Sequence, residues 1–72
     1  MKKTFKLQDL DCANCAAKME KAIGQLDGVN RVSVNFMTQK MILDANDDRF
    51  ETILDEACAL MRKIEPDCRV IR

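Results

Sequence analysis

Alternating hydrophobic and polar residues mark two stretches of the chain and predict β-strands. The alternation covers residues 4–7 and 29–36, and two further strands are predicted at 40–45, as the hairpin partner of the second, and at 68–72. A period of two places apolar side chains on one face of a sheet and polar side chains on the other. Residues 37–39 are short enough to join the second and third strands as a hairpin.

Two other stretches have apolar residues at helical spacing. The first begins at Cys15, and its apolar face is formed by Ala16, Met19, Ile23 and Leu26. We expect Cys12 or Asn14 to cap its start and Gly28 to end it as the C′ residue.

The second helix is predicted from an apolar stripe formed by Phe50, Ile53, Leu54, Ala57, Met61 and Ile64. The turn at 46–48 is expected to supply the N-cap and negative charge at its start. Pro66 is expected to stop it, because the residue before a proline avoids the helical conformation.

The predicted order β-α-β-β-α-β is typical of an α+β, ferredoxin-like sandwich, in which two helices cover one face of a four-stranded antiparallel sheet. Residues 1–72 form a single domain in this interpretation, without repeats or linkers. The topology brings the end of the first strand, the start of the first helix and the end of the second helix to one edge. We therefore expect Asp11, Cys12, Cys15, Glu65 and Asp67 to lie close together.

Charge and composition exclude several classes of function. Twelve basic and twelve acidic residues give a net charge of zero, which argues against a strongly basic nucleic-acid binder. No apolar run approaches the roughly 18 residues that cross a bilayer, and the first residues lack the apolar region of a secretory signal. We expect a cytoplasmic, monomeric domain that neither binds nucleic acid nor inserts into a membrane.

The cysteines carry the evident chemistry. Cys12 and Cys15 form a C-x-x-C pair, and the chain has no histidine, so that a metal site would consist of sulfur and oxygen ligands. In a reducing compartment such a pair indicates metal binding or redox work. The thiolate is the ligand, and a helix N-terminus together with Lys18 would favour it.

Two other interpretations of the cysteines are weaker. A thiol–disulfide enzyme is disfavoured, because no general base or peptide-binding aromatic residue accompanies the pair. A structural four-cysteine zinc site would need Cys58 and Cys68, but these lie ten residues apart, which is the wrong spacing for a second zinc knuckle. Both are expected to fill core positions instead.

The residues Asp11-Cys12-Ala13-Asn14-Cys15-Ala16, followed by Gly28-Val29 and Val32-Ser33-Val34-Asn35, resemble a heavy-metal-associated domain over essentially the whole chain. This family comprises soluble metallochaperones and cytosolic domains of heavy-metal-transporting P-type ATPases. Its copper-binding loop typically reads Gly-Met-Thr-Cys-x-x-Cys. The present loop has Asp9, Leu10 and Asp11 at the first three positions. Asp11 in place of threonine, with the ending Ile64-Glu65-Pro66-Asp67, is similar to the zinc-, cadmium- and lead-exporting branch. Leu10 is expected to pack beneath the loop.

Coordination chemistry favours the same branch. Cu(I) gains little from a carboxylate, whereas Zn²⁺ and Cd²⁺ take four ligands and accept oxygen. We therefore expect Cys12, Cys15 and Asp11 to bind Zn²⁺ or Cd²⁺, with Pb²⁺ as a further candidate. The fourth ligand is left open between Glu65, Asp67, Cys68 and water. The expected function is metal binding and transfer to, or within, a P-type ATPase, without catalysis by this module itself. A Cu(I) chaperone is the alternative.

Overall fold

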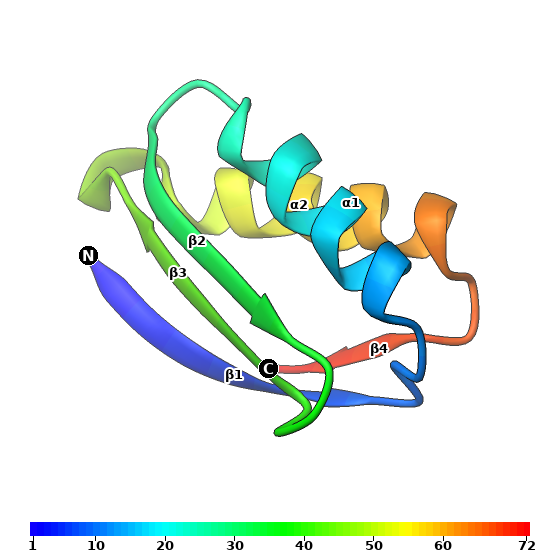
Figure 1. Cartoon of the computed structure of the whole chain (residues 1–72). Coiled ribbons are helices and arrows are strands. Elements are labelled where there is room, and N and C mark those ends of the chain that lie inside the picture. Colours follow the sequence, from blue (N-terminus) through cyan, green and yellow to red (C-terminus); the bar gives the residue numbers. More distant parts are fainter.

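A four-stranded antiparallel sheet carries both helices on one of its faces (Figure 1). The computed structural model describes residues 1–72. Its elements are β1 (Lys2–Gln8), α1 (Ala13–Gly24), β2 (Val29–Asn35), β3 (Lys40–Ala45), a 3₁₀ turn η1 (Asp47–Arg49), α2 (Phe50–Ile64) and β4 (Arg69–Ile71). The strands lie in the order β2-β3-β1-β4. The predicted ferredoxin-like sandwich is confirmed.

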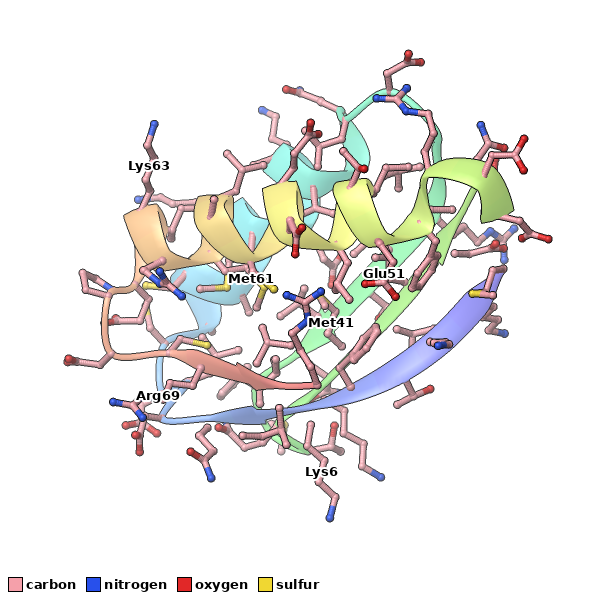
Figure 2. The ribbon with its side chains drawn as sticks, turned by 180° about the vertical axis from the view of Figure 1, so that it is seen from behind. Lys6, Met41, Glu51, Met61, Lys63 and Arg69 are labelled. Atoms are coloured by element: carbon pink, nitrogen blue, oxygen red, sulfur yellow. The ribbon has the colours of Figure 1, made fainter.

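The core lies between the helices and the sheet. Figure 2 shows Met41 of β3 and Met61 of α2 inside this layer, while Lys6 and Lys63 extend outward on opposite sides. Met41 and Met61 are almost completely buried, as is Met19 of α1. The helical spacing predicted Met19 and Met61 as core residues. Neither helix has the length and apolar character that crossing a bilayer requires.

Helix α1 begins and ends earlier than its apolar pattern predicts. It starts at Ala13, because Cys12 is the N-cap residue and its sulfur accepts a hydrogen bond from the Cys15 backbone N–H. It ends at Gly24, a poor helix former. The amides of Gln25 and Leu26 then bond three residues back, to Ala22 and Ile23, in a tightened last turn. Leu26 therefore lies beyond the helix, although it still packs against the core.

The sequence predicted Gly28 as the C′ residue of α1, and this is wrong. Gly28 lies in the turn that leads into β2. Its φ of +94° lies in the left-handed region. A Cβ at this position would come within 2.8 Å of Ile53 Cδ1. Both the backbone conformation and the space therefore require glycine here.

Gly28→Ala is expected to lower the free energy of unfolding by about 2 kcal/mol, because it combines an unfavourable φ with overpacking of the core. Urea denaturation measures the change. Gly24→Ala is the matched control, since its Cβ would meet only Val32 Cγ1, at an ordinary 3.7 Å. That variant should be neutral or more stable, because alanine has the higher helix propensity. Equal losses in both variants would contradict this explanation.

Helix α2 also begins differently from the prediction. Residues 47–49 form the 3₁₀ turn, the N-cap position is Arg49, and no side chain caps the helix. The expected capping by the turn at 46–48 is therefore wrong. The end of the helix is as predicted: Ile64 is its last residue, and Glu65 adopts an extended conformation before Pro66. The strand that follows is shorter than expected, because Cys68 and Arg72 lie outside it.

Candidate functional site

The two cysteines of the C-x-x-C pair meet at the start of α1. Cys12 lies in the loop that follows β1, and Cys15 lies in the first turn of the helix. The backbone N–H of Cys15 donates a hydrogen bond to Cys12 Sγ at 3.2 Å. Both side chains are half-buried, and all four cysteines of the chain are free thiols. The helix N-terminus thus holds two accessible sulfur atoms close together.

The end of α2 brings a carboxylate to this pair. Glu65, the residue at the C-terminal end of the helix, accepts a hydrogen bond from the Cys15 thiol, with 3.9 Å between Sγ and Oε2. Figure 1 shows why residues so distant in sequence meet here: α1 begins and α2 ends at the same end of the sandwich. The topological prediction that Glu65 lies beside the cysteines is confirmed.

Hydrogen bonding makes the two thiols unequal. The pKa of Cys12 is lowered by the hydrogen bond with the Cys15 side chain and by the Cys15 backbone N–H. The pKa of Cys15 is raised by its hydrogen bond to Cys12 and by burial, and the nearby charges of Cys12 and Glu65 add to the effect. Lys18 opposes this rise. Cys12 is therefore the first to become a thiolate, and Cys15 keeps its proton longer.

Asp11 lies on the exposed side of the loop. Together with Asp9, Glu65 and Asp67 it lines an acidic surface pocket of about 580 Å³, which also includes Arg69. The sequence prediction that these loops adjoin is thus confirmed. The side chains are not grouped so that three or more His, Cys, Asp or Glu residues could hold an ion together. Cys12 and Glu65 are each hydrogen-bond partners of Cys15, whereas Asp11 lines the acidic pocket.

Two contacts support the loop from below. Leu10 is completely buried, as the sequence predicted, and anchors the loop in the core. Gln39, in the turn between β2 and β3, accepts a hydrogen bond from the Leu10 N–H at 3.0 Å and donates one to the Leu10 carbonyl. Gln39 could not be predicted from the sequence, because a polar residue in a hairpin turn carries no periodic signal. Asp9 has a φ of 61°, a left-handed conformation that asparagine and aspartate tolerate better than most residues.

The remaining cysteines stand apart from this pair. Cys68 is 6% exposed and belongs to the core, and Cys58 is half-buried against the core. Both line a different surface pocket, of about 400 Å³, between α2 and β4. Burial raises the pKa of each of these thiols. Their role as packing residues agrees with the sequence analysis.

Comparison with known proteins gives one family and several relatives. Residues 4–66 match the family model described as the heavy-metal-associated domain. A zinc/cadmium/lead-transporting P-type ATPase of Escherichia coli is 49% identical over 45 residues, which cover 62% of this chain. The match covers only 6% of that protein. The copper chaperone CopZ of Enterococcus hirae is 25% identical over 71 residues, and the match covers 99% of this chain and all of CopZ.

The solved structures agree on the fold. A CopZ metallochaperone superposes with a TM-score of 0.76 over 99% of this chain and 100% of its own, at 15% identity. The family model spans residues 4–66, from β1 through the loop with Cys12 and Cys15 to the end of α2, and stops before β4. By fold, by sequence and by the cysteine pair at the start of α1, the chain belongs to the heavy-metal-associated domain family.

Proposed function

We propose that the chain binds a divalent soft or borderline metal ion, Zn²⁺ or Cd²⁺ with Pb²⁺ as a further candidate, and passes it to, or within, a heavy-metal-transporting P-type ATPase. The observation that carries the proposal is the pair of accessible sulfur atoms at the start of α1 with a carboxylate 3.9 Å from Cys15 Sγ. In this proposal the domain acts in the cytoplasm as a monomer and performs no catalysis of its own.

Cys12 and Cys15 are the proposed sulfur ligands, and Asp11 is the proposed oxygen ligand. Asp11 directly precedes Cys12 in the loop, and its exposed carboxylate is accessible to an incoming ion. Two thiolates and one carboxylate carry three negative charges, which suits a doubly charged ion better than Cu(I). The similarity to the zinc/cadmium/lead-transporting ATPase of Escherichia coli supports the same choice.

Glu65 is our candidate for the fourth ligand. Sulfur and oxygen ligands of one tetrahedral zinc ion, with bonds of roughly 2.3 and 2.1 Å, lie about 3.6 Å apart. The distance of 3.9 Å between Cys15 Sγ and Glu65 Oε2 is close to this value. Cys68 is buried in the core, which makes it the weaker candidate. The position would also be open to a ligand from a partner, which would allow the ion to be handed over by ligand exchange.

Cu(I) is the second candidate for the cargo. The similarity to the copper chaperone CopZ of Enterococcus hirae over almost the full length of both chains favours it. Two thiolates alone satisfy Cu(I), since soft sulfur ligands select this ion. In that case the carboxylates of Asp11 and Glu65 would have no part in binding.

Competitive titration distinguishes the two cargoes. We expect the reduced domain to take up one Zn²⁺ or Cd²⁺ ion per chain and to hold it against a chromophoric chelator of matched affinity. The same chain with Cu(I) should lose its ion to a thiol competitor more easily than a copper chaperone does. Retention of Cu(I) together with rapid loss of Zn²⁺ and Cd²⁺ would contradict the proposal.

Metal binding is expected to strengthen as the pH rises. The pKa of Cys15 is raised by its hydrogen bond to Cys12 and by burial, so the free domain keeps this proton near neutral pH. Binding must release it, and below the pKa of Cys15 the affinity should therefore rise about tenfold per pH unit for each proton released. Titrations between about pH 6 and pH 8, with proton release followed by an indicator dye, test this. An affinity independent of pH would show that the ion does not displace the proton of Cys15.

A further inference from the structure

Gln39 combines two unusual features in the turn between β2 and β3. Its φ of 55° lies in the left-handed region, where glycine is favoured and glutamine is rare. Its side chain is half-buried and reaches out of its own turn to a different loop. Unfavourable backbone conformations persist where the surrounding structure or the function holds them. The contacts of the Gln39 side chain are the candidate reason for its left-handed backbone conformation.

The amide group of Gln39 matches the backbone of Leu10. Oε1 accepts a hydrogen bond from the Leu10 N–H at 3.0 Å, and Nε2 donates to the Leu10 carbonyl oxygen. Nε2 also donates to the carbonyl oxygen of Phe36 within the turn. The backbone carbonyl of Gln39 accepts a further bond from the Leu7 N–H at 2.8 Å. Both N–H donors and the oxygen of the Gln39 side-chain amide therefore have hydrogen-bond partners.

Leu10 needs these partners. It lies between β1 and α1, outside any strand or helix, and its side chain is completely buried. Buried backbone N–H and C=O groups require hydrogen-bond partners, and here a side chain from another loop supplies both. Without Gln39, the loop backbone at Leu10 would have to move toward water to satisfy its polar groups.

We infer that Gln39 is a positioning residue for metal binding: its amide fixes the loop backbone at Leu10, and thereby holds Asp11 and Cys12 in place beside Cys15. The inference rests on the proposed metal-binding function. Asp11 and Cys12 follow Leu10 directly in the chain, so the backbone that carries them starts from the point that Gln39 fixes. A loop ordered before the ion arrives does not have to be ordered by the binding event, and this raises the affinity.

Gln39→Gly and Gln39→Asn separate this role from simple folding. Glycine suits the left-handed backbone and removes the amide, so the turn should fold at least as readily. Asparagine also tolerates the left-handed backbone and keeps the amide, but it is one methylene too short to reach Leu10. Asn35→Ala is the matched control: Asn35 accepts hydrogen bonds from Met37 and Thr38 inside the same turn and makes none to the metal-binding loop.

Two measurements on the reduced full chain test the inference. In the metal-free domain, amide hydrogen exchange at Leu10 should be about tenfold faster or more in both Gln39 variants and unchanged in Asn35→Ala. In competition with a chelator, the dissociation constant for Zn²⁺ should rise about 10- to 100-fold in both Gln39 variants, as it does when outer-shell partners of metal sites are removed. Asn35→Ala should bind like the unmodified chain, even if it unfolds at a lower temperature.

The results separate the two proposals. If the unmodified chain binds Zn²⁺ and Gln39→Gly binds it equally well, the positioning role is wrong and the proposed function stands. An unchanged exchange rate at Leu10 would overturn the positioning role in the same way. If the unmodified chain does not bind Zn²⁺ or Cd²⁺, the proposed cargo itself is wrong, whatever the exchange rates show.

Discussion

Replacing Cys12 or Cys15 by serine is expected to abolish tight binding of Zn²⁺ and Cd²⁺ while the domain stays folded. Each variant removes one of two sulfur ligands, so the loss should exceed the roughly 100-fold that outer-shell changes can cause. The fold should survive because both side chains are only half-buried, at the start of α1. Serine is also a good N-cap residue and can accept the hydrogen bond that Cys12 accepts from Cys15.

Titration with a competing chelator measures the loss of binding, and circular dichroism follows the fold. Cys58→Ser is the matched control, because Cys58 lies against the core beside a different pocket and should not affect the ion. Unfolding of Cys12→Ser and Cys15→Ser in the absence of metal would show that the pair is structural. Unchanged binding in both would place the site elsewhere in the chain.

Asp11→Asn is expected to weaken the binding of Zn²⁺ and Cd²⁺ and to leave Cu(I) binding nearly unchanged. Asparagine has the same shape but no charge, so the ion loses an anionic ligand while the loop keeps its geometry. The loss for the divalent ions should be at least about tenfold, the lower end of what outer-shell changes cost. Cu(I), bound by the thiolates alone, has little to lose.

The comparison needs a control for charge. Asp9→Asn removes a carboxylate from the same acidic pocket, and asparagine tolerates the left-handed conformation of position 9. Asp9→Asn should therefore change the affinity only through screened, long-range attraction. Equal losses for Zn²⁺ and Cu(I) in Asp11→Asn, or equal losses in both variants, would show that Asp11 is not a ligand.

The strands and the second helix could be predicted from the sequence because most of their apolar residues recur at strand or helix spacing. The bounds predicted for the third strand are those of β3, and the apolar stripe of α2 is buried from Phe50 to Met61. The closeness of Cys15 to Glu65 could also be predicted. The topology alone brings the start of α1 and the end of α2 to the same edge.

The details of the loop before α1 could not be predicted in the same way. The sequence left the N-cap open between Cys12 and Asn14, and the structure selects Cys12, whose sulfur accepts from the Cys15 N–H, a role in which oxygen side chains are the usual signal. The hydrogen bonds between Gln39 and Leu10 join two segments that share no pattern and lie 29 residues apart. Such contacts depend on the tertiary structure, so neither periodicity nor turn propensity reveals them.

X-ray absorption spectroscopy of the Zn²⁺- or Cd²⁺-loaded domain is the decisive experiment for the proposed ligands, because it counts the sulfur and oxygen neighbours of the ion. The proposed site requires two sulfur ligands, at about 2.3 Å for zinc, together with oxygen ligands at roughly 2.0–2.2 Å. A shell of sulfur atoms alone would contradict it.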